Sequence, residues 1–486
     1  MPKRSSDFRV PVAAAASVVV DGAQFTRGYR AWMLFILMLM NALNLADRQG
    51  LAAVAPALKR DLHLTDTELG LIQGLGFAIF YTLLGLPIAR LSERYSRARI
   101  IAVSIAVFST FGALASAARN FTMLLLCRIG VGMGDAGAIG PPLYSLLGDH
   151  YPAGKRGAAT TMIWLGAPVG ALAGAAIGGW TAQHAEWRTW FIALAIPGFL
   201  AGALAFFTLR EPRRGTFDAG GVTQGPVPSA REAARFLFAK RSMRHVLLGA
   251  AFSAIALNGM GQFFARYFVA VFQIGPGQAG KMLGMLVIVA MTSGFIIGGF
   301  GVDWAVRRDR RWYVWLPGVS LLIAMPLFEI GLLQPSLTRA MSVLLPAHVA
   351  LFIFYTPTLT IAQNMVDASM RASSSFTVAI VFGLVGIGLG PTTVGVISDL
   401  AASRSFGAGS FVTQCPGGAA RPGAGTDLAN TCAAASAHGI QFAMAAVAVL
   451  LLWGSLHYFV AARTLRADLD ARYRPDARYR TMGPSA

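Results

Sequence analysis

Charged residues are scarce in this chain of 486 residues. Aspartate, glutamate, lysine and arginine make up 13% of it, whereas the hydrophobic set makes up 55%. Soluble globular domains carry about 25% charged residues, so an ordinary soluble domain is excluded and lipid is favoured as the surrounding medium. We predict an all-α membrane protein, because a helix satisfies its own backbone polar groups where no water can reach them.

Motifs for ATP-driven or hydrolytic chemistry are also missing. We find no Walker loop, no zinc-ligand spacing and no serine or cysteine nucleophile with its partners. The run 130–137, with its glycines at 130, 132, 134 and 137, resembles a dinucleotide loop but lies inside an apolar segment with no preceding strand. Close helix packing through small residues explains it better. We expect no enzyme activity, no cofactor and no metal.

Twelve segments are long and apolar enough to cross the hydrocarbon, which takes roughly 20 residues. A polar, arginine-rich linker at 210–243 divides them six and six. We therefore predict twelve transmembrane helices in two pseudo-symmetric six-helix bundles, 30–209 and 244–465, with tails at 1–29 and 466–486. The expected spans are 31–57, 68–90, 98–117, 121–147, 156–180, 188–209, 244–272, 277–303, 312–333, 338–364, 372–400 and 437–463.

The net charge of +19 would indicate nucleic acid as the partner of a soluble protein. Its distribution indicates a membrane instead. With both termini in the cytoplasm, 30 of the 41 lysine and arginine residues fall in the cytoplasmic tails and loops, as the positive-inside rule requires. We expect a monomer in the bacterial inner membrane that contacts lipid and no nucleic acid.

Cysteine is rare, with three residues in the chain. Cys127 lies in a predicted span, where a thiol is a small apolar side chain. Cys415 and Cys432 share the glycine-rich stretch 401–436, which the predicted orientation places outside, where thiols oxidise. We predict a disulfide between them; two unpaired thiols are the alternative.

Two loops carry an acid followed by several arginines, one after the second span and one after the eighth. The first resembles the major facilitator superfamily signature G-x-x-x-D-[RK]-x-G-[RK]-[RK], with Ala89 for the first Gly, Ser96 for the second, Glu93 for Asp and Ala98 for the final base. The fifth span resembles that superfamily's Gly-Pro gating motif. The resemblance implies gating roles for Glu93, Arg94, Arg97, Arg99, Gly166, Pro168, Gly170 and Asp303.

A closer resemblance is to the Spinster family within that superfamily. The first span reads Asn44-Leu-Ala-Asp47-Arg48, like the family's N-x-x-D-R element. The fourth span reads Gly132-Met-Gly134-Asp135-Ala-Gly137, like its G-x-G-E-A-G element with Asp in place of Glu. The resemblance implies a proton-linked or gradient-driven carrier of lysolipids, including lysophospholipids and sphingoid phosphates.

Ionisable residues deep in a span are functional candidates, because a charge at the bilayer centre costs at least about 2.5 to 3.5 kcal/mol. Helical rise places Asp47 roughly 24 Å from the inner face and Arg128 roughly 10 Å below the outer face, so their depths nearly coincide. Asp135 lies seven residues from Arg128, on almost the same helix face. We predict proton coupling at Asp47 and Asp135; a purely structural set of buried ion pairs is the alternative.

Guanidinium groups suit a phosphate or carboxylate head group. The predicted substrate-binding residues are Asn44, Arg48, Arg128, Tyr144, Arg266 and Tyr267. Arg266 could instead gate the outer mouth or extend to the membrane interface. Other polar residues at depth, each of which could also serve helix packing, include Tyr81, Asn258 and Tyr355.

The expected function is secondary active transport by alternating access, with a lysolipid as the first substrate choice. An exporter of amphipathic drugs and a carrier of organic anions or sugars remain alternatives. An energy-independent lipid scramblase and a non-transporting receptor are alternatives of another class.

Overall fold

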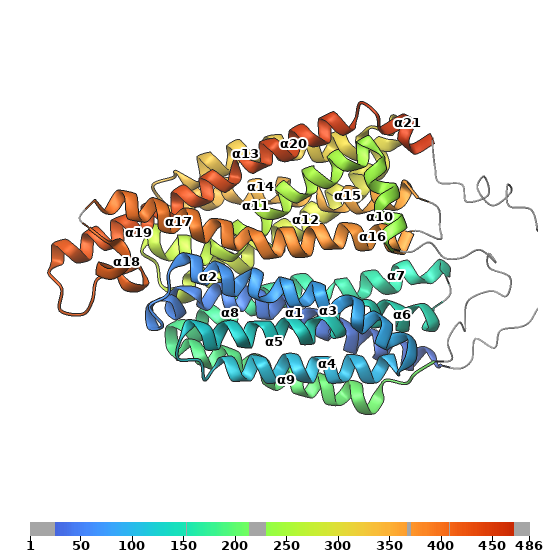
Figure 1. Cartoon of the computed structure of the whole chain (residues 1–486), viewed down its shortest axis with the longest axis horizontal. Coiled ribbons are helices and arrows are strands. Elements are labelled where there is room, and N and C mark those ends of the chain that lie inside the picture. The colour runs from blue at the N-terminus through green and yellow to red at the C-terminus, as the bar shows by residue number, and fades with distance from the viewer. Residues whose placement is uncertain (1–24, 152, 213–229, 367–370, 408, 471–486) are drawn as a thin grey trace, which may run out of the picture.

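The computed structural model describes residues 25–470, apart from 152, 213–229, 367–370 and 408. All the regular elements in these residues are helices, and they form two elongated groups that lie side by side (Figure 1). Following the predicted orientation, we call the end that carries α18 the outer end, and the end that carries α10 and α21 the inner end.

The N-terminal group contains nine helices: α1 (Arg27–Asp61), α2 (Asp66–Gln73), α3 (Leu75–Arg94), α4 (Arg97–Ala115), α5 (Phe121–Ala138), α6 (Pro141–His150), α7 (Ala153–Trp164), α8 (Gly166–His184) and α9 (Trp187–Thr208). The rest of the described chain contains α10 (Ala230–Ala239), α11 (Arg241–Phe272), α12 (Pro276–Val306), α13 (Trp312–Leu332), α14 (Leu337–Phe352), α15 (Tyr355–Asn364), α16 (Arg371–Ile380), the π-helix η3 (Val381–Leu389), α17 (Gly390–Phe406), α18 (Phe411–Gln414), the 3-10 turn η4 (Pro416–Gly418), α19 (Thr426–Ala448), α20 (Leu450–Ala461) and α21 (Leu465–Asp470).

Twelve helical segments in the described residues are long and apolar enough to cross a membrane, as predicted. Several of them are two helices in series. The break between α5 and α6 coincides with Pro141 and Pro142, and the break before α8 lies three residues ahead of Pro168. Proline lacks an N–H and its ring clashes with the preceding turn, so it ends or bends a helix.

At the outer end, the helices of the last two predicted spans extend further than the spans themselves. Helix α17 continues to Phe406 and α19 begins at Thr426, so the predicted loop 401–436 shortens to 407–425. Residues 429–437 are mostly alanine, the best helix former, which explains why this stretch is helical. Cys432 therefore lies on α19, and it forms a disulfide with Cys415 across a Cα–Cα distance of 5.5 Å.

The predicted linker 210–243 is partly helical. It contains the short helix α10, and α11 already begins at Arg241. The middle of the linker, 213–229, lies outside the described residues.

Glycines set the distance between α1 and α8. A Cβ atom on Gly170 would lie 1.9 Å from the carbonyl oxygen of Ala42, and one on Gly174 would lie 2.3 Å from that of Ala46. Gly166 approaches Met38 in the same way. Two of the predicted gating residues, Gly166 and Gly170, thus allow backbone contact inside the N-terminal group.

Glycines also bring the two groups together. Gly179 on α8 faces Gly280 on α12, with its virtual Cβ 2.9 Å from the Gly280 Cα. On a second seam, between α2 and α17, a Cβ on Gly70 would lie 2.4 Å from the Pro391 carbonyl oxygen. A Cβ on Gly395 would lie 2.1 Å from the carbonyl oxygen of Asp66. Only glycine fits at these positions without displacement of a backbone.

The close contact between α1 and α8 predicts that alanine substitution destabilises the protein at one buried helical glycine and not at another. Gly170→Ala should lower the free energy of unfolding by about 1 to 3 kcal/mol, because the new methyl group overlaps a backbone carbonyl. Gly112→Ala on α4 is the matched control, since a Cβ there meets no atom within 4 Å and alanine favours the helix. Thermal unfolding of the purified variants in detergent would test this, and equal midpoints would refute the close contact.

Candidate functional site

The first pair of charged residues at the centre of the N-terminal group is Asp47 on α1 and Arg128 on α5. The Arg128 Nη1 lies 2.8 and 3.0 Å from the two carboxylate oxygens of Asp47. Both residues are 1% exposed. The two residues predicted to lie at similar depth therefore form a fully buried ion pair.

The second acid, Asp135 on α5, faces a different arginine. Arg48 is the charged residue that interacts with it most strongly, and Asn44 of α1 also lies near it. Asp135 is 4% exposed, whereas Arg48 is only half-buried. No described acid lies within ion-pair distance of the Arg48 guanidinium, so Arg48 is the less neutralised of the two arginines.

The ring of Phe77 on α3 lies next to both arginines. The guanidinium carbons of Arg48 and Arg128 lie 5.2 and 5.7 Å from its centroid. Tyr81, one turn along α3, stacks on Phe77 with a centroid distance of 5.6 Å. Cation–π attraction offsets part of the cost of holding two cations close together away from water.

Aromatic residues of the other group complete the surroundings of Arg48. Tyr355 on α15 interacts electrostatically with Arg48 and with Tyr144 on α6. Its ring lies 4.5 Å from that of Phe382, centroid to centroid. Tyr144 is 44% exposed and lies near Trp164. Arg48 therefore lies at the interface between the two groups, with tyrosines contributed by both.

The π-helix η3 supplies Phe382 to this region. It spans nine residues and contains three glycines. Gly386 packs on Ala254 and Asn258 of α11, and Gly388 packs near Ala78 of α3. π-Helical turns are rare and are often found at functional sites. The glycine content of this stretch indicates close packing. Nothing in the sequence indicates a π-helix with its extra residue per turn, so the position of Phe382 could not be predicted.

The predicted gating residues at the inner end are only partly brought together. Arg97 contacts Asp149 at 2.5 Å and Glu211 at 2.6 Å, which ties α4 to the ends of α6 and α9. Arg94 and Arg99 are exposed, and the Glu93 side chain lies outside the described residues.

In the second loop, Asp303 is exposed and has no ion pair among the described residues. The ion pair there is formed by Asp309, which lies 2.6 Å from Arg466. The N–H of Arg311 and the Arg466 side chain hold the pKa of Asp309 below its usual value.

Arg266 and Tyr267 are neighbours on α11, but their side chains contact different parts of the protein. Tyr267 is buried and donates a hydrogen bond to the Leu332 carbonyl oxygen at 2.9 Å, which favours a structural role. Arg266 contacts Asp66 at 3.5 Å and donates a hydrogen bond to Ser436. No contact among the described residues joins either residue to Arg48 or Asp135, so the structure does not bring them together with those two side chains.

Comparison with known proteins agrees with this architecture. Residues 37–391 match the family model of the Major Facilitator Superfamily. The fold superposes, with a TM-score of 0.84, on a solved bacterial homologue of the human lysosomal transporter Spinster in an inward-facing and unoccupied conformation. That comparison covers 93% of this chain and 100% of the homologue at 30% sequence identity.

Two curated bacterial proteins are similar over most of their length. An MFS-type efflux pump of Mycolicibacterium smegmatis is 26% identical over 394 residues, or 80% of this chain and 89% of the pump. A hexuronate transporter of Bacillus subtilis is 26% identical over 380 residues, or 76% of this chain and 87% of the transporter. The chain therefore belongs to the major facilitator superfamily and is a multi-pass membrane transporter related to the Spinster proteins.

Proposed function

We propose that this transporter carries a lysolipid with an anionic head group across the bacterial inner membrane, as a monomer, by alternating access and together with protons. The observation that carries the proposal is the arrangement of Arg48 and Asp135 at the interface of the two groups. Among the described residues no acid lies within ion-pair distance of Arg48, and Asp135 is a buried acid that interacts with it. The first can bind an anion and the second can bind a proton.

Arg48 is a better candidate for the head group than Arg128. The charge of Arg128 is balanced by Asp47, whose two oxygens its Nη1 contacts, and the Arg128 side chain is fully buried, so a ligand has less access to it. The guanidinium of Arg48 is partly accessible, and a planar guanidinium binds phosphate or carboxylate through two parallel hydrogen bonds. Tyr81 and Tyr355 interact with it electrostatically, and rings with a polar edge suit the junction between a head group and an acyl chain.

Alternating access requires the two groups to separate at one end while they stay in contact at the other. The superposition on an inward-facing Spinster homologue and the glycine contacts at the outer end of α2 and α17 support an inward-open conformation for this structure. In that state Arg48 would receive or release substrate on the cytoplasmic side.

Asp135→Asn tests the proton site. Asparagine keeps the shape of the side chain but cannot bind and release a proton, so uptake driven by a pH gradient in proteoliposomes should fall to background. Ligand binding should stay within about threefold, because the head group contacts Arg48. Glu186→Gln is the control, since the Glu186 side chain is 76% exposed. Undiminished gradient-driven uptake by Asp135→Asn, with an unchanged pH profile, would contradict this assignment and indicate Asp47 as the proton site.

The Asp47 and Arg128 pair should behave as a structural ion pair. Asp47→Asn leaves Arg128 buried without a counter-charge, which should cost about 3 to 5 kcal/mol of stability. The double variant Asp47→Asn/Arg128→Gln removes both charges and should regain most of that loss. Thermal unfolding of the single and double variants measures both effects. A double variant that stays as unstable as the single one would contradict this assignment.

A thermal-shift screen tests the substrate class. A ligand that binds the folded state at about 100 times its Kd stabilises it by about 2.7 kcal/mol. An anionic lysophospholipid should raise the unfolding temperature of the wild type and leave that of Arg48→Gln unchanged. Arg188→Gln, at the outer surface, should respond like the wild type. If only a hexuronate or only a cationic drug raises the unfolding temperature, the substrate is an organic anion or a drug and not a lysolipid.

A further inference from the structure

Four charged side chains, two positive and two negative, meet at the outer end of the molecule, away from Arg48 and Asp135. Lys59, in the last turn of α1, is 2% exposed and forms an ion pair with Asp66 at the start of α2. Arg266 of α11 approaches the same carboxylate, and Ser398 of α17 donates a hydrogen bond to it at 2.7 Å. Asp399 is the fourth charged member, so the cluster contains two cations and two acids. We call these four residues the outer cluster.

Asp399 joins the C-terminal group to the first turn of α2. Its carboxylate accepts hydrogen bonds from the N–H groups of Asp66 and Thr67, at 2.9 and 2.7 Å, and from the Thr67 hydroxyl at 2.6 Å. The first N–H groups of a helix have no partner within the helix, and a carboxylate there is also stabilised by the helix dipole. An acid from one group thus caps a helix of the other.

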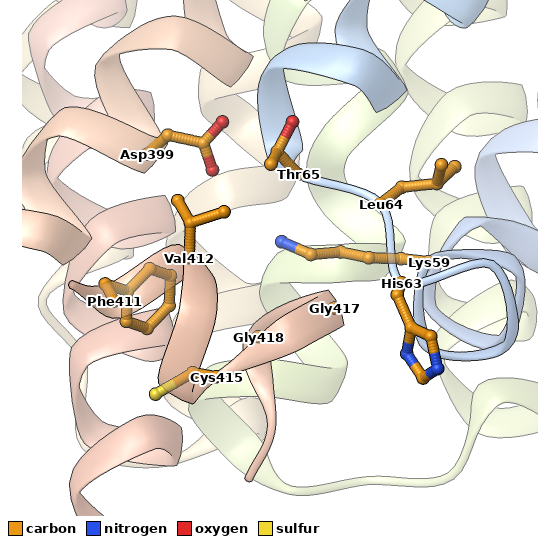
Figure 2. A pocket seen from close by; sticks show the side chains of 10 residues that line it. All are labelled: Lys59, His63, Leu64, Thr65, Asp399, Phe411, Val412, Cys415, Gly417 and Gly418. Atoms are coloured by element: carbon orange, nitrogen blue, oxygen red, sulfur yellow. The ribbon is translucent and has the colours of Figure 1, made fainter. Parts of the chain in front are cut away.

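A turn of the outer loop covers this cluster. Gly417 and Gly418 adopt φ values of 69° and 82°, which other residues rarely adopt. A Cβ on Gly417 would lie 2.8 Å from the Lys59 carbonyl oxygen, and one on Gly418 would lie 3.3 Å from the Arg266 Nη2. Figure 2 shows Lys59 extending between Thr65 and this turn. The space that remains is about 10 Å³, room for at most one water molecule.

The disulfide fixes the turn to the C-terminal group. Cys415 directly precedes the turn, and Cys432 lies on α19 one helical turn before Ser436, the partner of Arg266. Both cysteines are buried in a small apolar cluster with Phe406 and Phe411, separate from the main core. The turn therefore moves with the C-terminal group, whereas Lys59 belongs to the N-terminal group.

We propose that residues 409–425 form a disulfide-held lid that keeps the outer end of the transporter closed by covering the outer cluster. Opening to the outside then requires the lid to leave Lys59 and α2 as the cluster separates. Without the disulfide, the turn loses the shape that fits the cluster, and the outward-open state becomes more populated. This inference rests on the alternating access of the proposed function.

A reporter cysteine behind the cluster measures outer opening. Thr392 of α17 is half-buried and directs its hydroxyl toward the Gly70 carbonyl oxygen across the α2 to α17 seam. In a Cys127→Ser background, Thr392→Cys should react slowly with a membrane-impermeant maleimide added outside spheroplasts. Adding Cys415→Ser/Cys432→Ser should raise the labelling rate about tenfold, as expected for a shift in the population of an outward-open state.

A glycine pair provides a second test that leaves the disulfide intact. Gly418→Ala should also raise the labelling rate, because its methyl group would lie 2.7 Å from the Ser436 Oγ. Gly423→Ala should not, although Gly423 has a φ of 86°, because nothing lies within 4 Å of its Cβ position. If the disulfide variant does not fold, this pair decides the question.

Equal labelling rates in Gly418→Ala and Gly423→Ala, or an unchanged rate without the disulfide, would overturn the lid. The labelling rate needs neither substrate nor a pH gradient. A labelling result that contradicts the lid would therefore not affect the proposals for Arg48 and Asp135. Equally, a failure of pH-driven uptake would not affect the labelling result.

Discussion

A charge inside hydrocarbon needs an opposite charge within reach, because no water is present to solvate it. This requirement explains how the buried charged residues of this transporter are grouped. Asp47 faces Arg128, Asp135 faces Arg48, and Asp66 faces Lys59 and Arg266. Each such group joins at least two helices, and the outer cluster joins the two halves of the molecule. The pairs that hold one half together can stay intact during transport, whereas a cluster that spans both halves has to separate when they part.

The contacts between the halves differ along the length of the molecule. At the outer end, glycines bring the backbones of α2 and α17 together, and the outer cluster and the lid lie beyond them. Around Arg48, aromatic side chains come from both halves: the ring of Phe77 lies 5.2 Å from its guanidinium carbon, and Tyr355, which contacts Phe382, interacts with it electrostatically. Backbone contact leaves no space for a ligand, but aromatic side chains can change rotamer and make room. Glycine contacts therefore suit a seal, and aromatic contacts suit a binding site.

Much of the fold could be predicted from the sequence because lipid imposes simple rules on length and apolarity. The rise per residue also sufficed to place Asp47 and Arg128 at one depth. It could not decide which acid pairs with which arginine, because that depends on helix rotation and on the position of Phe77. The outer cluster could not be predicted from the sequence, for another reason. Asp66 and Ser398 are 332 residues apart, and Lys59 lies just beyond the predicted end of the first span, where a charge needs no explanation. The helical position of Cys432 was missed because an alanine-rich extension beyond the membrane was interpreted as loop.

The charges around Arg48 also connect the sign of the substrate to the direction of coupling. Asp47, Asp135, Arg48 and Arg128 together are neutral when both acids are ionised. A proton on Asp135 leaves one positive charge, held mainly by Arg48, and an anionic head group restores neutrality. Burying a net charge is costly, so proton and anion favour each other's binding and would move together in one direction. A cationic drug would instead compete with the proton for Asp135 and be exchanged for it. Because no acid of the described residues lies within ion-pair distance of Arg48, the first arrangement has the lower electrostatic cost. The proposed function therefore couples an anionic lysolipid to proton symport rather than a cation to proton exchange.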